Sequence, residues 1–427
     1  MTGRQVRAII ITGTGGPGHV LPYDVFMRIA LVLEKFKLAK GGAERSSYEL
    51  AGGLAELGHH VTLLAGTIER DSSVEPPFDL HSLSVSGPRG KVRWRRFQHA
   101  VIRHLHANEY DIVHSMVPLT AAQVYQPRGG SILYSARRHA QSYDFPLLAK
   151  LKRATLALNR PRQARIAAER KLCAAADGPV VAALSNYVAE QFKSEYNLPD
   201  HRLRVIPNGV ATDPLIDEKA QSLGRKFRRQ FDKNNDLALF LFAAQNPRLK
   251  GLTCLIQAAH LAARRRTGQR DFRILAVSGW KYASYWRLAQ RLNLDRRVVF
   301  MGSTRLITPL VQMCDAVVLP TFNDACSRLI LEALAVGRPA ITTRFNGAAE
   351  FLDQGKYGLV IDEPNDVEAL ADALLQLADR KQHLKMTSAI EADQLREKVS
   401  LRRHVRRLLE LYQQIIPPHT TPRKLSV

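Results

Sequence analysis

Short apolar runs alternate with amphipathic stretches along the chain. Such runs lie at residues 29–33, 61–65, 112–114, 180–184 and 203–206, and again at 239–243, 273–278, 298–301, 316–319, 340–343 and 358–361. Strands that alternate with helices form parallel sheets with helices on both faces. The pattern therefore predicts the α/β class, with two doubly wound Rossmann-like domains facing a cleft. A chain of 427 residues is long enough to bury both cores.

A polar, charged stretch that includes DKNND separates the two halves. We expect an N-terminal domain over residues 27–211 and a C-terminal domain over residues 212–401. A helix at about 402–416 is expected to pack back on the N-terminal domain, and residues 417–427 form a tail. Ligands of such sheets bind beyond the carboxyl ends of the strands, so the cleft between the domains is where we expect a site.

Two glycine-rich loops compete for the start of the first domain. One lies in IIITGTGGPGHVLP at residues 9–22, and the other follows the strand that Met27 opens, in LEKFKLAKGGAERSS. The glycine-rich loop at residues 13–18 has no helix after it, which a phosphate-binding strand, loop and helix unit requires. We therefore predict that residues 1–26 form a flexible N-terminal extension.

Positive charge dominates the composition. Lys and Arg number 62 against 39 Asp and Glu, a net charge of +23, which favours an anionic partner. Residues 89–106 carry six Lys or Arg and no acid, with Trp94 and Phe97 among the apolar residues. Two interpretations stay open: a helix on an anionic membrane surface, or a solvated helix packed on a sheet. A second basic stretch, residues 150–171, is predicted to be helical and exposed.

Several classes of protein are not favoured by the sequence. No helix-turn-helix, zinc or RNA-recognition motif accompanies the charge, so no nucleic-acid partner is expected. The four cysteines lack the spacing of a metal site or a disulfide framework, and no apolar run is long enough to span a membrane. We expect a cytoplasmic protein, peripheral on the inner face of the cytoplasmic membrane if its basic stretch binds lipid.

The most informative stretch is CDAVVLPTFNDACSRLILEALAVGRPAITT at residues 314–343. A strand ends at Pro320, a polar loop follows, and a helix is predicted over residues 327–336. The positive end of this helix suits a diphosphate, and the amides there belong to Ala325, Cys326 and Ser327. Asp324 stands at the mouth of this pocket and Glu332 lies within the helix. Without further evidence, the simpler interpretation is that Asp324 caps the helix and that Glu332 is an acid on the protein surface.

A resemblance adds to these motifs. An acid, seven residues and a second acid, followed by ALAVGRPAITT and FNGAAEFL, resemble the E-x7-E region of retaining, nucleotide-sugar-dependent glycosyltransferases of the GT-B fold. GGAERSSYELAGGLAELGHHVTLL, LRVIPNGV and LFLFAAQNPRLKGLTCLIQAA resemble further parts of that family, so the likeness covers nearly the whole chain after Met27. More narrowly, the sequence is similar to the family-four-like, lipopolysaccharide-core glucosyltransferase branch.

The resemblance implies roles for individual residues. Arg248 and Lys250 would face the donor's phosphates and neutralise the charge that grows on the leaving diphosphate. Asp324 would hold hydroxyls of the transferred sugar, although the family usually has Glu there, which puts the donor preference in doubt. Glu332 would accept hydrogen bonds from the ribose.

Three glycines complete the expected donor site. Gly41 and Gly42 would let the backbone of the first domain approach the phosphates, and Gly302 would lie near the base. The alternative for the first two is a plain turn between strand and helix. No catalytic base is assigned, because His114 reads as an ordinary strand-end histidine and the departing phosphate can accept the acceptor's proton.

The chain contains no D-x-D motif, so we expect no metal, and the nucleotide-sugar is a co-substrate rather than a cofactor. The implied reaction is retaining transfer of a hexose, from a UDP-sugar by preference, to a saccharide or lipid-linked acceptor in cell-surface polysaccharide or lipopolysaccharide biosynthesis. The domain over 27–211 would then be the acceptor side and that over 212–401 the nucleotide-sugar side. Two alternatives stay open: a non-catalytic, nucleotide-sugar-binding relative, and a nucleotide-sugar 2-epimerase.

Overall fold

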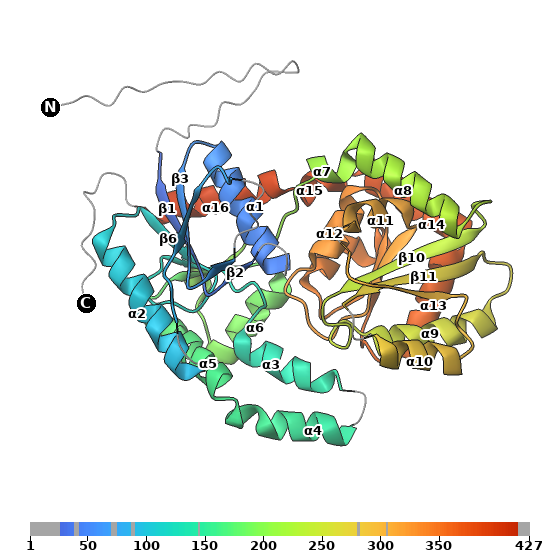
Figure 1. Ribbon diagram of the computed structural model, residues 1–427, viewed down its shortest axis with the longest axis horizontal. Coiled ribbons are helices and arrows are strands. Elements are labelled where there is room, and N and C mark those ends of the chain that lie inside the picture. The colour runs from blue at the N-terminus through green and yellow to red at the C-terminus, as the bar shows by residue number, and fades with distance from the viewer. Residues whose placement is uncertain are drawn as a thin grey trace, which may run out of the picture.

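The computed structural model describes residues 26–37, 42–69, 75–86, 90–143, 146–279, 282–304 and 306–416. Three expectations therefore lie outside the described residues: the N-terminal extension apart from Phe26, the tail at residues 417–427, and the place of Gly41. Within the described part, two large parallel sheets form the left and right halves of the molecule in Figure 1. The α/β class and the doubly wound plan are confirmed.

The first sheet is entirely parallel. Its strands lie in the order β5 (Asp79–Ser82), β3 (His60–Ala65), β1 (Arg28–Leu33), β6 (Ile112–Ser115), β7 (Val124–Tyr125), β8 (Val180–Ala183) and β9 (Leu203–Val205). A short parallel pair, β2 (Phe36–Lys37) with β4 (Ile68–Glu69), lies apart from it. The chain winds outward from β1 to β5 and then returns to the other side of β1, so the order of the strands reverses between β1 and β6.

The second sheet repeats this plan. Its parallel strands lie in the order β12 (Val298–Met301), β11 (Asp271–Ser278), β10 (Leu237–Ala244), β13 (Ala316–Leu319), β14 (Ala340–Thr343) and β15 (Gly358–Ile361). Here the order of the strands reverses between β10 and β13. Sheets that carry helices on both faces have strands with nearly continuous apolar sequences, and LALFLFAA of β10 is of this kind.

Helices cover both faces of each sheet. Around the first sheet lie α1 (Gly42–Glu56), α2 (Lys91–Ala107), α3 (Ile132–Gln141), α4 (Pro146–Ala154), α5 (Arg160–Ala174), α6 (Asn186–Tyr196) and the last helix, α16 (Leu401–Ile415). The second half contains α7 (Asp213–Ile216), α8 (Glu218–Phe231), α9 (Leu252–Arg265), α10 (Ala283–Arg291), α11 (Ile307–Met313), α12 (Arg328–Ala335), α13 (Val367–Ala378), α14 (Arg380–Ala392) and α15 (Leu395–Lys398). Two 3-10 segments, η1 (Thr155–Leu158) and η3 (Gly347–Gly355), complete the elements used below.

Strand β1 shows how two apolar layers arise from one strand. Ile29, Leu31 and Leu33 point into a cluster with residues of α1 and α16, whereas Ala30 and Val32 point into a second cluster with α2. Side chains of a strand alternate between the two faces of a sheet, so each face has its own core. The last helix thus packs in the first half of the molecule although its sequence follows the second half (Figure 1).

Helix α2 settles the two interpretations of the first basic stretch. Trp94, Phe97, Val101 and Leu105 are all buried, and they pack in the cluster on the α2 face of the first sheet. The membrane interpretation of this apolar face is therefore wrong, because the face is already covered by the protein. The alternative, a solvated helix packed on a sheet, is confirmed.

The second basic stretch is helical, but it is only partly exposed. Glu169 of α5 is fully buried, and its carboxylate accepts hydrogen bonds from the hydroxyls of Tyr125 and Tyr196 and from the backbone N–H of Ile132. Burial raises the pKa of Glu169. This acid fixes α5 to β7 and to the start of α3, so the prediction of an exposed helix is wrong for α5.

Truncation of Phe97 tests the burial of α2. Replacing a buried phenylalanine by alanine leaves a cavity, so Phe97→Ala should lower the free energy of unfolding by about 3–5 kcal/mol. Ile102 lies on the same helix and is 38% exposed, so Ile102→Ala should cost less than about 1 kcal/mol. Urea unfolding followed by circular dichroism measures both values, and equal small effects would contradict the packing of α2.

Candidate active site

The predicted basic pair and the predicted acid follow the two strands at which the order of the second sheet reverses. Arg248 and Lys250 lie in the loop after β10, and Asp324 lies in the loop after β13. The carboxyl ends of parallel strands meet at one edge of a sheet, and ligands bind in the crevice where the strand order reverses. The topology alone therefore brings these three side chains to one place.

Lys250 and Asp324 are in direct contact. The Lys250 Nζ lies 2.5 Å from Oδ2 of Asp324, and it also donates to the backbone carbonyl of Asn323 at 3.1 Å. Both side chains are about one-fifth exposed, so the pair borders solvent rather than being sealed in the core. A ligand in the cleft can reach both members.

Arg248 contacts the other half of the molecule. Its guanidinium carbon lies 3.7 Å from the centre of the Tyr143 ring, in the segment after α3. Stacking on an aromatic face holds a guanidinium in place without neutralising its charge. Arg248 makes no ion pair within the described residues, so its charge is free for an anionic ligand.

The amides at the start of α12 are largely occupied. The backbone N–H of Cys326 donates to Oδ1 of Asp324, and that of Ser327 donates to Oδ1 of Asn346. The helix begins at Arg328, one residue after the predicted start at Ser327, and Ala325 is buried beside it. The predicted anion site is therefore partly filled by the protein itself, because the Asp and Asn side chains already accept hydrogen bonds from two of these amides. A diphosphate-binding role for these amides stays a prediction, and it requires them to exchange partners.

Glu332 is paired inside the protein rather than exposed on its surface. Its Oε1 lies 3.3 Å from Nη2 of Arg328, one helical turn earlier. Arg328 in turn makes two hydrogen bonds to the carboxylate of Glu49, at 2.8 and 3.0 Å, and one to the hydroxyl of Ser46. Burial alone would lower the pKa of Arg328, but Glu332 and Glu49 raise it above its usual value. The reading of Glu332 as a surface acid is therefore wrong, and its contact with a ribose stays a prediction.

This chain of charges joins the two halves of the molecule, because Ser46 and Glu49 belong to α1. Sequence reasoning identified neither Arg328 nor Glu49. The spacing of four residues between Arg328 and Glu332 is a signal for a helical ion pair. Nothing in the sequence connects Glu49 to Arg328, which lies 279 positions further along the chain.

The glycines expected in the site differ in what surrounds them. Gly42 is exposed at the start of α1, and a Cβ there would lie 3.6 Å from the side chain of Arg328. Gly302 follows β12 and is exposed, and a Cβ added to it would have no other atom within 4 Å among the described residues. The structure thus gives Gly42 a place beside the Arg328 network, whereas no contact at Gly302 requires a glycine.

Further contacts hold the loop after β13 against the first half. Ser185 donates through its hydroxyl to the carbonyl of Ala325 at 2.8 Å, and Arg138 donates to the carbonyl of Phe322 at 2.9 Å. A Cβ on Gly347 would overlap both Ser185 and the Ala325 carbonyl. Only glycine permits this close approach, so Gly347 is required for the arrangement of the two halves seen here.

A cavity of about 260 Å³ opens on the first half of the molecule. Its lining includes Met116, Val117 and Pro118 after β6, Arg128 after β7, His139 of α3 and Arg162 of α5. Burial, followed by the nearby charges of Arg162, Arg248 and Lys250, lowers the pKa of His139 to about 4. The cavity therefore lies within reach of the basic pair, and His139 in it is neutral at pH 7.

Arg128 is the unusual member of this lining. Its guanidinium donates to Oδ1 of Asn208 at 3.2 Å, while Nη2 has no partner among the described residues. Burial, followed by the charge of Arg328, lowers its pKa to about 10, so it remains charged at pH 7. Sequence reasoning did not assign Arg128, His139 or Arg162 to a site, because their three segments meet only in the folded chain.

His114 lies close by but is closed to solvent. Its Nδ1 is 2.5 Å from the hydroxyl of Tyr412, and its Nε2 has no partner among the described residues. Burial, followed by the charge of Arg128, lowers its pKa well below the usual value. A neutral, enclosed imidazole agrees with the prediction that His114 is not the base.

No group of three His, Cys, Asp or Glu side chains with the geometry of a metal site lies among the residues described. Metal independence stays a prediction.

Comparison with known families identifies the class of protein. Residues 40–214 match the model of Glycosyltransferase Family 4, and residues 237–380 match that of Glycosyl transferases group 1. These matches cover the first and the second half of the fold in turn. The chain is a glycosyltransferase of the GT-B fold.

Individual relatives are similar along most of their length. Lipopolysaccharide glucosyltransferase WaaG of Escherichia coli (strain K12) is 24% identical over 349 residues, which cover 82% of this chain and 88% of WaaG. D-inositol 3-phosphate glycosyltransferase of Corynebacterium urealyticum is 28% identical over 422 residues, covering 94% and 92%.

Solved structures agree in fold. A crystal structure of WaaG, described as a glycosyltransferase involved in lipopolysaccharide biosynthesis, superposes with a TM-score of 0.71 at 21% identity, covering 90% of this chain and 99% of WaaG. The structure of Anabaena Alr3699/HepE in complex with UDP-glucose has a TM-score of 0.63 at 18% identity, covering 91% and 100%.

Removal of the Glu49 charge tests the ion pair between the two halves. Hydrogen bonds to charged groups contribute about 1.5–3 kcal/mol. Glu49→Gln should therefore raise the proportion of open molecules, in which the two halves have moved apart, by about tenfold or more relative to the closed arrangement described here. Small-angle X-ray scattering should then give a larger radius of gyration than for the wild type. Glu44→Gln, on the same helix, is the matched control, and an unchanged radius in Glu49→Gln would contradict the role of the pair.

Proposed function

We propose that this protein is a retaining, metal-independent hexosyltransferase that uses a UDP-sugar as donor. The observation that carries the proposal is the placement of Arg248, Lys250 and Asp324 beyond β10 and β13, where the strand order of the second sheet reverses. The UDP-glucose complex of a structurally similar protein supports the choice of nucleotide. No cofactor is needed besides the donor itself.

The basic pair supplies the chemistry of the leaving group. As the bond from the sugar C1 to the diphosphate oxygen breaks, negative charge grows on the diphosphate, and fixed cations stabilise it. Arg248 makes no ion pair within the described residues and is held by Tyr143, while Lys250 exchanges Asp324 for phosphate. Asp324 is then released to accept hydrogen bonds from hydroxyls of the sugar.

The anomeric configuration at C1 of the sugar is retained if the acceptor attacks from the side of the departing diphosphate. The acceptor oxygen forms the new bond to C1, and its proton passes to the phosphate oxygen that leaves. This step needs no enzymic base, in keeping with the neutral and enclosed His114. The role proposed for Glu332 is to accept hydrogen bonds from the ribose, with Arg328 fixing its carboxylate.

The acceptor is proposed to bind in the 260 Å³ cavity of the first half. Arg128 and Arg162 in its lining favour a saccharide that carries an anionic group, free or lipid-linked. The similarity to WaaG, whose name describes a lipopolysaccharide glucosyltransferase, supports a role in lipopolysaccharide or other cell-surface polysaccharide biosynthesis.

Donor turnover tests the proposal. UDP-, GDP-, ADP- and dTDP-hexoses are incubated with the protein in EDTA, with and without saccharide acceptors. We expect turnover of a UDP-hexose, with a loss of about 100- to 1000-fold in Lys250→Ala and a comparable defect in Glu332→Ala. Lys233→Ala, at an exposed position of the same half, should behave as wild type. The anomeric configuration of the product, measured by NMR, should match that of the donor.

The same assay separates the alternatives. Binding of a nucleotide-sugar without any turnover would support the non-catalytic relative, for which the Asp324 in place of the usual Glu is the motivating residue. Conversion of the donor sugar without an acceptor would support the 2-epimerase. An inverted product, or a strict need for a divalent cation, would contradict the proposed mechanism.

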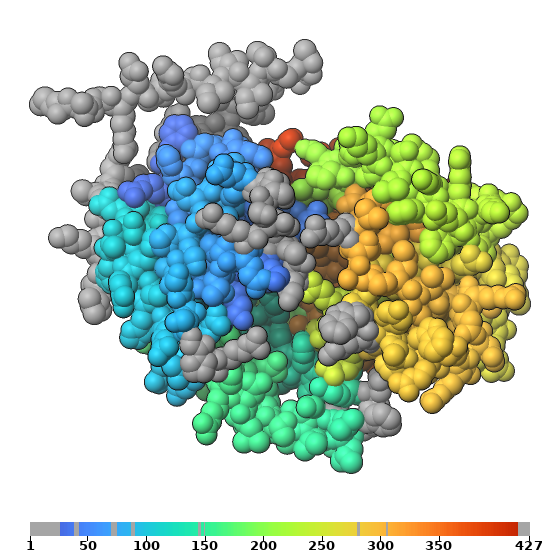
Figure 2. Space-filling view, in the orientation of Figure 1, coloured from blue at the N-terminus to red at the C-terminus, as the bar shows by residue number. Residues whose placement is uncertain are grey.

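A contact with the membrane is proposed for α4 and η1 instead of α2. Four leucines in these two segments are exposed: Leu147 (78%), Leu148 (42%), Leu151 (54%) and Leu158 (77%). Exposed cations stand among them at Lys150, Lys152 and Arg153. Figures 1 and 2 place α4 at the lower rim of the molecule, at the surface. Apolar and basic side chains together suit the surface of an anionic bilayer.

This arrangement supports a peripheral protein on the inner face of the cytoplasmic membrane, where a lipid-linked acceptor would be reached. No helix within the described ranges has the length and apolar character needed to cross a bilayer.

Vesicle flotation tests the membrane contact. The wild type should float with phosphatidylglycerol vesicles at low salt, and Leu147→Asp with Leu151→Asp should reduce the bound fraction by about tenfold or more. Leu384→Asp, at another exposed leucine of the second half, is the control. Equal flotation of both variants, or equal binding of the wild type to neutral vesicles, would contradict the proposal.

A further inference from the structure

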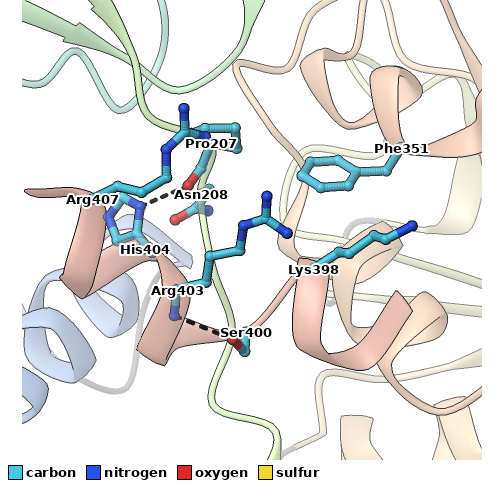
Figure 3. Close-up of a pocket in the computed structure, with 8 residues that line it drawn as sticks. All are labelled: Pro207, Asn208, Phe351, Lys398, Ser400, Arg403, His404 and Arg407. Atoms are coloured by element: carbon cyan, nitrogen blue, oxygen red, sulfur yellow. Dashed lines mark hydrogen bonds between the residues drawn. The ribbon is translucent and has the colours of Figure 1, made fainter. Parts of the chain in front are cut away.

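A second cavity, of about 130 Å³, lies where the chain passes between the two halves. It is lined by Pro207, Asn208, Phe351, Lys398, Ser400, Arg403, His404 and Arg407 (Figure 3). We call it the hinge cavity. None of its lining residues also lines the cavity proposed for the acceptor. Arg248, Lys250 and Asp324 do not line it either.

The hinge cavity adjoins both connections between the halves. The backbone N–H of Val210, in the first connection, donates to the carbonyl of Val399, and that of Leu401, in the second, donates to the carbonyl of Val210. A Cβ on Gly209 would overlap the Ser400 carbonyl and His404. The two connections therefore cross in tight contact beside the cavity.

Two arginines on one face of α16 face this space without a partner. Arg403 and Arg407 are four residues apart, so they lie on one side of the helix. Neither arginine makes an ion pair or a side-chain hydrogen bond within the described residues. The lining of the cavity contains no Asp or Glu from the described part of the chain. Arg403 is exposed and Arg407 is half-buried, so an ion from solvent can reach both guanidinium groups.

The other polar groups of the cavity do not offset this charge. In Figure 3 the ammonium of Lys398 points away from the two arginines, while the guanidinium of Arg403 lies between α16 and the ring of Phe351. His404 donates through Nδ1 to the carbonyl of Pro207 at 2.7 Å. Asn208 is buried, its Oδ1 accepts from Arg128, and its Nδ2 is the group that can donate to an oxyanion.

We propose that the hinge cavity binds a small oxyanion of the phosphate type, held by Arg403 and Arg407 and completed by Asn208. Guanidinium groups bind phosphate through two parallel N–H bonds, which is the strongest hydrogen-bonding arrangement available to these side chains. A volume of about 130 Å³ is several times that of one water molecule in the liquid, about 30 Å³, so a tetrahedral anion fits.

The walls of the hinge cavity come from both halves of the molecule. Arg403 and Arg407 belong to α16, whose Val405 and Leu408 are anchored in the core of the first half, whereas Phe351 belongs to η3 of the second. Opening at the crossing would separate these walls. Asn208 also contacts the carbonyl of Cys326, in the loop before α12, at 3.5 Å. One polar group of the hinge cavity thereby contacts the loop that precedes α12.

Phosphate titration tests the site directly. Isothermal titration calorimetry with inorganic phosphate is done at constant ionic strength in chloride, with UDP at saturation so that the donor site is occupied. The wild type should bind phosphate, and the double variant Arg403→Gln, Arg407→Gln should bind at least tenfold more weakly. The matched control is Arg402→Gln, Arg406→Gln, which removes two exposed charges from the same helix and should bind as the wild type does. No binding, or equal loss in both double variants, would overturn the proposal.

Discussion

The pairing of charges between the two halves is the constraint on which the site depends. Arg328 is largely buried, and a buried guanidinium is stable only with carboxylate partners and hydrogen bonds. Glu332 comes from its own helix and Glu49 from α1, so the network is complete only when the halves are closed. The same closure places Tyr143 on Arg248 and Ser185 on the carbonyl of Ala325. The ion-pair network of Arg328 and the contacts of Tyr143 and Ser185 therefore form together when the two halves meet.

The fold explains why cations gather there. Both sheets are parallel, so their carboxyl ends expose loops and helix N-termini rather than tight hairpins. Arg248 and Lys250 follow β10, and their charges act on His139 of the first half together with the charge of Arg162. In the proposed mechanism, a nucleotide-sugar brings a diphosphate to this field, and the cations stabilise the charge that develops as the sugar leaves. Asp324, the acidic partner of Lys250, would be set free by the same event.

Much of the fold could be predicted from local sequence patterns, because strand and helix periods are local properties. The apolar strands and α12, with Ser327 before it, occur where the patterns place them. The polar strand β5 (DLHS) and the two-residue β7 have no such pattern and were missed. The apolar face of α2 was visible in the sequence, but its partner was not. Membrane and sheet bury the same side chains, so only the fold distinguishes them.

The basic pair and the two acids of the proposed donor site were likewise accessible from sequence, whereas Glu49, Arg128 and the hinge arginines depend on contacts between distant segments. The account rests on the place of the donor's diphosphate, and a crystal structure with UDP, grown in EDTA, tests that place most directly. The account predicts phosphate oxygens within hydrogen-bonding distance of Arg248 and Lys250, with the contact between Lys250 and Asp324 broken. A diphosphate bound elsewhere, or an intact pair of Lys250 and Asp324 beside bound UDP, would contradict it.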